Sequence, residues 1–293
     1  MTASVMPALQ NHRVSVVIPA MNEAENLPHV LPRIPAWVHE VLLVDGHSID
    51  DTIAVARHLL PTVRIVTQEG RGKGAALRSG FAAATGDIIV MLDADGSTDP
   101  AEIPAFVGAL LCGADFVKGS RFLQGGGTAD MPHHRRLGNA AFVQTVRLLF
   151  GGRYSDLCYG YNAFWARVLP LLQLDGDGFE IETMMNVRAL RAGLKVAEVP
   201  SFEAARVYGE GRLRTIPDGW RVLKTIYRER RSPLQLAVPA NATPRRPVAI
   251  ILEADVPVAN EALRLQPTTE QIIIPEHMPA DARIEAAVVA EGD

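Results

Sequence analysis

Residues 88–95 read Ile-Ile-Val-Met-Leu-Asp-Ala-Asp, an apolar run that ends abruptly in two carboxylates. The run is typical of a buried strand, and ligands of open α/β sheets bind just beyond the carboxyl ends of strands. Asp93 and Asp95 would repel each other there. A divalent cation removes the conflict, because Mg²⁺ and Mn²⁺ prefer hard oxygen ligands and share them with substrate phosphates. The segment predicts a metal–diphosphate site, and a strand followed by an acidic turn is the alternative.

Strand and helix patterns alternate through the first 120 residues. Strands are expected at 14–18, 41–44, 63–66, 88–92 and 116–118, and helices at 23–31, 51–60, 74–84 and 100–111. This alternation predicts a mainly parallel sheet with helices on both faces. The strands are continuous apolar runs, as is typical of buried parallel strands. Later elements are expected as helices at 137–150, 181–192 and 216–230 and a strand at 196–200.

Composition limits the classes of function. The chain has 293 residues and a net charge of −4, so its charge gives no case for binding nucleic acid. Its two cysteines, Cys112 and Cys158, form neither a metal-binding pattern nor a disulfide framework. Neither an apolar run of about 18 residues nor a signal-peptide pattern is present. We therefore expect a cytoplasmic protein, with peripheral contact at the inner face of the cell membrane left open.

The charge and the proline content change near Ser232. Residues 232–293 contain nine Asp and Glu against four Arg, together with eight prolines, whereas residues 1–231 carry a net charge of +1. This shift predicts a globular domain over residues 13–231. It also predicts a Pro-rich, acidic C-terminal appendage over residues 232–293, partly ordered or disordered, which we expect to be dispensable for chemistry.

Four polar clusters follow the first four expected strands. They are Pro-Ala-Met-Asn-Glu at 19–23, Asp-Gly-His-Ser at 45–48, Gly-Arg-Gly-Lys-Gly at 70–74 and Asp-Ala-Asp-Gly-Ser at 93–97. Because the carboxyl ends of parallel strands meet at one edge of a sheet, the clusters can converge on a single ligand. The third cluster is neither a Walker sequence nor a dinucleotide fingerprint, since its spacing and its place in the chain differ from both.

Two residues of these clusters have a functional and a structural interpretation. Asp45 can accept hydrogen bonds from a ribose or a base, or it can simply form a turn or cap. Lys73 stands at the start of a helix, where the lysine and backbone N–H groups suit an anionic phosphate. The alternative for Lys73 is an ordinary solvated lysine.

The motifs as a set resemble glycosyltransferase family 2, of the Rossmann-like GT-A fold, over about residues 13–230. The resemblance rests on Val-Val-Ile-Pro-Ala-Met-Asn-Glu (16–23), Val-Asp-Gly-His-Ser (44–48), Gly-Lys-Gly-Ala-Ala-Leu-Arg (72–78) and Leu-Asp-Ala-Asp (92–95). Later motifs are similar to those of dolichyl-phosphate mannosyltransferases and other polyprenyl-phosphate glycosyltransferases. These are Lys-Gly-Ser-Arg-Phe (118–122), Asp-Leu-Cys-Tyr-Gly-Tyr-Asn-Ala-Phe (156–164), Gly-Phe-Glu-Ile-Glu (178–182) and Gly-Glu-Gly-Arg-Leu (209–213).

This resemblance implies an inverting, metal-dependent transfer of a sugar from a UDP- or GDP-sugar to a polyprenyl phosphate of the dolichyl type. It implies that Asp93 and Asp95 hold Mg²⁺ or Mn²⁺, and that Arg121 lies near the transferring phosphates. Asp95 and Arg121 are therefore candidate catalytic residues. The expected nucleotide-sugar pocket comprises Pro19, Ala20, Asn22, Glu23, Asp45, Ser48, Lys73, Asp93, Ala94 and Asp95.

The acceptor determines which other residues the chemistry needs. A lipid phosphate is already mostly ionised near neutral pH, so it needs cations more than a general base. The expected cationic rim comprises Arg121, Arg135, Arg136, Arg206 and Arg212, with Arg214 beside it. An ordinary basic surface is the alternative. A hydroxyl acceptor would need a base, for which Glu180 and Glu182 are candidates unless they only serve the first turn of their helix.

Departures from the branch pattern leave the acceptor open. Gly211 and Arg212 stand where the branch usually has Ser and Lys, and Tyr-Gly-Tyr-Asn at 159–162 stands where it often has Ser-Gly-Phe-Arg. Transfer to a hydroxyl of a soluble metabolite is one alternative. A catalytically silent nucleotide-sugar-binding protein is another, although the aspartate pair and Arg121 argue against it. A sugar nucleotidyltransferase would need a glycine-rich, arginine-containing loop after the first strand, which is absent here.

Two further segments can be interpreted without a function. The basic helix expected at 216–231 could approach anionic lipid, and a solvated face is its alternative. His133 and His134 are expected to lie in a polar loop, because no acidic partner is close to them in the sequence.

Overall fold

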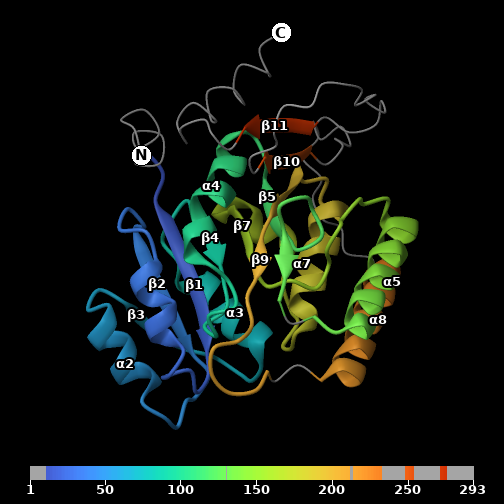
Figure 1. Cartoon of the computed structure of the whole chain (residues 1–293). Helices are drawn as coiled ribbons and strands as arrows, with labels where there is room; N and C mark the ends of the chain where they lie inside the picture. The colour runs from blue at the N-terminus through green and yellow to red at the C-terminus, as the bar shows by residue number, and fades with distance from the viewer. Residues whose placement is uncertain (1–10, 130, 212–213, 233–247, 254–270, 276–293) are drawn as a thin grey trace.

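The protein forms a mainly parallel sheet covered by helices on both faces (Figure 1). The structure is a computed structural model that describes residues 11–129, 131–211, 214–232, 248–253 and 271–275. The strands are β1 (Val14–Ala20), β2 (Glu40–Asp45), β3 (Arg64–Thr67), β4 (Ile88–Met91), β5 (Phe116–Ser120), β7 (Asn162–Trp165), β8 (Val196–Pro200), β10 (Val248–Glu253) and β11 (Gln271–Pro275). Their order is β11-β10-β8-β5-β7-β4-β1-β2-β3.

All neighbouring strands of this sheet are parallel except β7, which runs antiparallel to both β4 and β5. The α-helices are α2 (Thr52–Leu59), α3 (Lys73–Ala83), α4 (Ile103–Leu111), α5 (His133–Phe150), α6 (Leu169–Leu172), α7 (Glu180–Arg191) and α8 (Thr215–Arg231). Short 3₁₀ turns are η1 (Leu27–His29), η2 (Leu31–Arg33), η3 (Pro100–Glu102) and η4 (Ala166–Val168). Outside the main sheet, β6 (Gly127–Thr128) pairs with β9 (Phe202–Glu203).

Alternate side chains of the strands build two core layers. On β1, Val16 and Ile18 belong to the layer that contains η1, η2, α2 and α4, whereas Val17 belongs to the layer that contains α3, α7 and α8. All three side chains are fully buried. A strand buried on both faces must be apolar at every position, which explains the continuous apolar runs of the sequence.

Most of the expected elements are present, two expectations are wrong, and one strand was not expected. Residues 23–31 form no α-helix; they contain η1 and the first residue of η2, and each of these two elements has a proline in its first turn. His133 and His134 begin α5 rather than lying in a loop. The sequence did not predict β7, which enters the sheet antiparallel between β4 and β5.

The C-terminal appendage stays a prediction, because most of residues 232–293 lie outside the described residues. Within it, β10 pairs with β8 and β11 pairs with β10 at the edge of the main sheet. No helix in the described part of the chain has the length and apolar content needed to cross a bilayer.

The region just beyond the carboxyl ends of the neighbouring strands β1 and β4, hereafter the crevice, is the switch point of the strand order. From β1 the chain moves outward to β2 and β3 on one side, and then returns to place β4 on the other side of β1. The helical connections that follow two adjacent strands therefore diverge at this point, which is where open α/β sheets bind their ligands. The loops after β1 and β4 carry the expected site residues.

Candidate active site

The loops after β1 and β2 are tied to each other beside this crevice. The amide of Asn22 donates to Ser48 Oγ at 2.9 Å, and Asn22 Oδ1 accepts from the amide of Ile49 at 2.8 Å. Asn22 has a φ of 54°, a left-handed conformation that Asn tolerates better than most residues. Asp45 is buried and accepts from the amide of Ser48 at 3.2 Å. In this structure Asp45 thus makes the contact of a turn-forming aspartate.

Lys73 joins two carboxylates from distant parts of the chain. Its Nζ lies 2.6 Å from Asp93 Oδ1, after β4, and 2.7 Å from Glu182 Oε1, on the first turn of α7. Only 12% of the lysine side chain is exposed, which excludes the solvated alternative for Lys73. The structure therefore brings together Lys73, Asp93 and Glu182, three of the residues named from the sequence.

Gly160 leaves open the space beside this ion triad. A Cβ atom at position 160 would lie 2.7 Å from Asp93 Oδ2, 2.9 Å from Lys73 Nζ and 3.1 Å from Glu182 Oε1. All three distances are shorter than ordinary van der Waals contacts, so a side chain here would displace the charged groups. Gly160 is a site residue that sequence reasoning missed, although it lies in a motif that carries the family resemblance.

The glycines around Lys73 serve packing against residues 176–178. A Cβ atom on Gly72 would collide with the backbone oxygen of Asp177, and one on Gly74 would collide with that of Gly176. The amides of Gly74 and Ala75 donate to the same Asp177 oxygen at 2.8 and 3.3 Å. These two amides are engaged within the protein, and the side chain of Lys73 is the part of the turn that reaches the site.

Arg206 makes a second ion triad across the crevice. Its guanidinium lies 2.5 Å from Glu23 Oε2, after β1, and 3.4 Å from Asp95 Oδ2, after β4. The other oxygen of Asp95 accepts from the amide and the hydroxyl of Ser97 at 3.0 and 2.7 Å. Each aspartate of the pair is thus matched with its own cation, Asp93 with Lys73 and Asp95 with Arg206.

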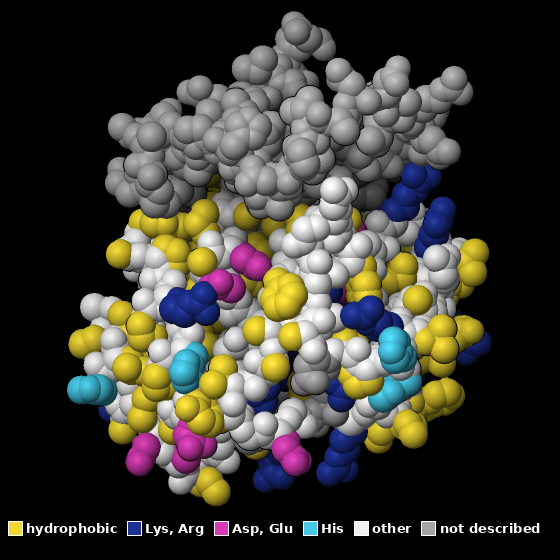
Figure 2. All heavy atoms as spheres, viewed as in Figure 1, with side chains coloured by type: hydrophobic (Ala, Val, Ile, Leu, Met, Phe, Trp, Pro, Cys, Tyr) yellow, Lys and Arg dark blue, Asp and Glu magenta, His cyan; other side chains and the backbone are white. Residues whose placement is uncertain are grey.

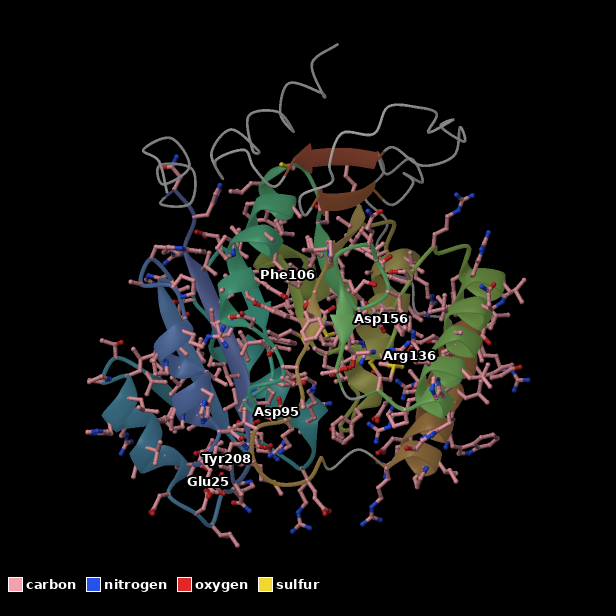
Figure 3. The ribbon with its side chains drawn as sticks, in the orientation of Figure 1. Glu25, Asp95, Phe106, Arg136, Asp156 and Tyr208 are labelled. Atoms are coloured by element: carbon pink, nitrogen blue, oxygen red, sulfur yellow. The ribbon has the colours of Figure 1, made fainter. Side chains whose placement is uncertain are left out.

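The segment that carries Arg206 is fastened to the ends of β1 and β4. The amide of Val207 donates to the Asp95 carbonyl at 3.3 Å, and Tyr208 exchanges two backbone–side-chain hydrogen bonds with Asn26 at 2.9 and 3.2 Å. Figure 3 shows Tyr208 at the same edge of the sheet as Asp95. The segment therefore connects the loop after β4 with the loop after β1.

Arg121 is buried in an ion-pair network of its own. It contacts both oxygens of Asp156, at 2.6 and 2.9 Å, and Glu203 at 3.0 Å, and it donates to the Cys158 carbonyl at 2.9 Å. Burial disfavours the charged guanidinium, but Asp156 and Glu203 outweigh it and raise the pKa of Arg121. In this structure Arg121 fastens the segment that leads to Gly160. Its expected contact with phosphates stays a prediction.

The remaining candidates lie apart from the two triads. Glu180 accepts from the amide of Gly178 at 3.0 Å, the contact expected of a first-turn acid. Arg135 and Arg136 are exposed on α5, and Arg136 is set apart from Asp95 (Figure 3). Arg212 lies outside the described residues. Of the described arginines expected in the cationic rim, Arg206 is the one that contacts Asp95 and Glu23 at the crevice.

The electrostatics of the first triad hold Lys73 as a cation. Burial alone would lower the pKa of Lys73, but the carboxylates of Asp93 and Glu182 outweigh this effect and raise it above the ordinary value. Desolvation raises the pKa of Asp93 to about 6, and the nearby Asp95 and Glu182 act in the same direction, whereas Lys73 opposes them. Asp93 is thus a carboxylate whose ionisation depends on a nearby positive charge.

The residues at the crevice fit a divalent cation shared with a ligand. Asp93 Oδ2 borders the space left by Gly160, and in the described part of the chain Asp95 Oδ2 has only the long contact with Arg206. Among the described residues, no group of three or more His, Cys, Asp and Glu is arranged to hold a metal ion. A metal at the aspartate pair would therefore take its other ligands from water and from a bound phosphate group, as Mg²⁺ commonly does.

An open, mainly parallel sheet with paired aspartates and two cations at its switch point is typical of α/β enzymes that bind phosphorylated ligands. Residues 15–169 match the family model described as glycosyl transferase family 2. The chain belongs to this family, and it is a glycosyltransferase. The family expected from the motifs is confirmed.

Two relatives have names that specify an activity. The chain is 32% identical over 227 residues to dolichol-phosphate mannosyltransferase of Pyrococcus furiosus, an alignment that covers 74% of this chain and 63% of that protein. It is 33% identical over 216 residues to undecaprenyl-phosphate mannosyltransferase of Micrococcus luteus, covering 69% of this chain and 87% of that protein. The chain thus spans less than two thirds of the Pyrococcus protein.

The fold is shared with glucosyl-3-phosphoglycerate synthase of Mycobacterium tuberculosis. One crystal structure of that enzyme superposes with a TM-score of 0.62 at 24% identity, covering 82% of this chain and 87% of the other. Its complex with Mn²⁺, UDP and glucosyl-3-phosphoglycerate gives a TM-score of 0.59 at 24% identity, covering 80% and 84%. This likeness confirms the GT-A fold.

Proposed function

We propose that the protein transfers a sugar from a nucleoside diphosphate sugar to a polyprenyl phosphate, with inversion at the anomeric carbon. One observation carries the proposal: Asp93 and Asp95 lie at the crevice between β1 and β4, each matched with a cation. The names of the Pyrococcus and Micrococcus relatives support a polyprenyl-phosphate acceptor. The complex of the Mycobacterium enzyme with Mn²⁺ and UDP supports a metal-bound nucleotide donor.

In this proposal Asp93 and Asp95 hold Mg²⁺ or Mn²⁺, which stabilises the charge that develops on the departing diphosphate. Among the described residues, Lys73 and Arg206 are the cations that contact these aspartates, so they would lie beside this charge. The raised pKa of Lys73 keeps it protonated, so it acts as an electrostatic partner and not as a base. A phosphate acceptor removes the need for a base, which agrees with the engagement of Glu182 by Lys73.

The test of the donor site is calorimetric titration with UDP- and GDP-sugars, with and without Mn²⁺. We expect one donor to bind in a metal-dependent way, and Asp95→Asn to lose that binding while its circular-dichroism melt stays cooperative. Asp87→Asn is the matched control, because Asp87 lies at the opposite end of β4, where it accepts from the amide of Arg13. Metal-dependent donor binding by Asp95→Asn equal to that of Asp87→Asn would contradict the proposal.

The acceptor is tested separately, once the donor is known. Radiolabelled sugar should move into the organic phase when a polyprenyl phosphate is supplied in detergent. Transfer to a soluble hydroxyl compound, with none to the lipid phosphate, would instead support the alternative acceptor. Donor binding without transfer to either class of acceptor would support a silent binding protein.

A further inference from the structure

Helices α5 and α8 form one flank of the molecule, at the opposite end from β3 (Figure 1). They are in contact: a Cβ atom on Gly219 would lie 3.8 Å from the Phe142 ring, and Arg135 Nε lies 3.3 Å from Thr215 Oγ1. Figure 2 shows dark blue, cyan and yellow side chains over this flank. Exposed cations and exposed apolar side chains thus share one surface.

The outward face of α8 carries large apolar side chains at helical spacing. Ile216 is 84% exposed, Trp220 is 68% exposed and Tyr227 is 53% exposed. Positions 216, 220 and 227 lie on one stripe of a helix with 3.6 residues per turn. Leu137 and Leu148, which are 74% and 83% exposed, lie three turns apart on one stripe of α5. So much exposed apolar surface on two adjacent helices indicates a partner.

The same two helices expose cations and no acids. Every residue of both helices is described, and the only acids are Asp218 and Glu229 of α8, which are 6% and 1% exposed. The exposed cations are Arg135, Arg136, Arg147, Arg221, Lys224, Arg228, Arg230 and Arg231. Since the whole chain has a net charge of −4, this concentration of positive charge is local. The partner must therefore offer apolar contact and negative charge together.

We propose that the α5–α8 flank docks on an anionic lipid bilayer. A bilayer with anionic headgroups meets both requirements, because apolar side chains enter the headgroup boundary while Lys and Arg remain at the charged surface. A second copy of the chain fits less well, since two such flanks would oppose cations to cations. A nucleic acid offers negative charge, but no apolar layer for Ile216 and Leu148.

The docking surface deepens the proposed function, on which it partly rests, because a polyprenyl phosphate resides in a bilayer. The segment that carries Arg206 leads along the chain to α8. Docking through α8 would therefore place the bilayer next to the helix that follows the Arg206 segment in the chain. Binding to vesicles that contain no acceptor tests the surface independently of any transfer activity.

The experiment measures partition of the full chain onto phosphatidylcholine vesicles with and without phosphatidylglycerol, by sedimentation and by tryptophan fluorescence. We expect binding only to the anionic vesicles, with a blue shift that Trp220→Ala removes, because Trp37 and Trp165 are partly buried already. Lys224→Gln should lower the partition about fivefold, the effect of one cation near an anionic surface. Lys224 has no hydrogen-bond or ion-pair partner among the described residues, so this change leaves the fold intact.

Arg57→Gln is the matched control, because Arg57 is likewise an exposed cation on a helix, but on α2 at the far edge of the sheet. Its partition should equal that of the wild type. Equal losses for Arg57→Gln and Lys224→Gln would overturn the proposal, because they would show attraction to net charge alone. Equal binding to neutral and anionic vesicles would overturn it, and so would self-association in sedimentation that Trp220→Ala abolishes. Vesicle binding without donor binding would leave the docking surface standing and refute the proposed activity.

Discussion

Replacing Gly160 by alanine adds one methyl group next to the triad of Lys73, Asp93 and Glu182. The backbone at Gly160 is outside the left-handed region, so alanine imposes no backbone strain there. The new Cβ atom would lie 2.7 Å from Asp93 Oδ2 and 2.9 Å from Lys73 Nζ. The substitution therefore tests the position of these charged groups and leaves their chemistry unchanged.

The size of the effect follows from the contact distances. Asp93 Oδ2 must retreat by about 0.7 Å to reach 3.4 Å, where ordinary contact begins. Overpacking of this kind costs about 1–3 kcal/mol. If Asp93 holds the metal, part of that cost falls on donor binding, and its full range corresponds to about a five- to 150-fold loss of affinity. We therefore expect a loss of metal-dependent donor affinity of at most about 150-fold.

The assay is calorimetric titration with the donor and Mn²⁺, accompanied by urea unfolding of each variant. Gly108→Ala is the control, because Gly108 lies in α4 and the added Cβ would meet no described atom within 4 Å beyond its chain neighbours and the backbone of its own helix. That variant should bind the donor like the wild type and gain up to about 1 kcal/mol of stability. Wild-type donor affinity in a folded Gly160→Ala protein would refute the placement of the site beside Gly160.

Two further predictions concern the buried charges around the site. Arg121→Met should lower the free energy of unfolding by about 3–5 kcal/mol, because it leaves the fully buried Asp156 without its cation. Arg33→Met is the control: it removes the exposed pair with Asp99 and should lower the free energy of unfolding by at most about 1 kcal/mol. Urea unfolding measures the stability of both variants. If Arg121→Met keeps the stability of the wild type but loses turnover, the result would instead support the expected role of Arg121 at the phosphates. Burial raises the pKa of Glu198 to about 7, so its ionisation should weaken the fold as the pH rises from about 4.5 through about 7. The advantage of Glu198→Gln over the wild type in free energy of unfolding should therefore grow by about 3 kcal/mol as the pH rises from about 4.5 to about 8. Urea unfolding at several pH values measures this advantage, and an advantage that does not change with pH would contradict the prediction.

The predictable part of the fold is the part that local pattern determines. The runs at 14–18, 41–44 and 88–92 are buried on both faces, so their apolar content identified them as strands of a parallel sheet. The antiparallel β7 was missed because only four residues form it and its place depends on the open edges of β4 and β5. The helix expected at 23–31 fails because Pro28 stands inside it, where proline removes a hydrogen bond and clashes with the preceding turn.

The candidate site was predictable in its residue types and not in its pairings. Strand ends placed Asp93, Asp95 and Glu23 at one edge of the sheet, and Lys73 followed from the same rule. Their partners come from far along the chain: Glu182 is 109 positions from Lys73, and Arg206 is 183 positions from Glu23. Such contacts depend on how α7 and the segment after β9 pack, which no local pattern determines.

The proposed docking flank and the candidate site are linked by buried charge. Glu229, on the inward face of α8, lies 2.8 Å from Arg188 and 2.9 Å from Arg191, both on α7. A pair with a fully buried carboxylate resists separation, because parting the charges would leave one of them unpaired in the interior. Helix α7 also carries Glu182, which binds Lys73 at the site. Since α8 is joined to α7 and α7 to the ion triad, the orientation in which α8 meets a bilayer would set the orientation of the site toward it.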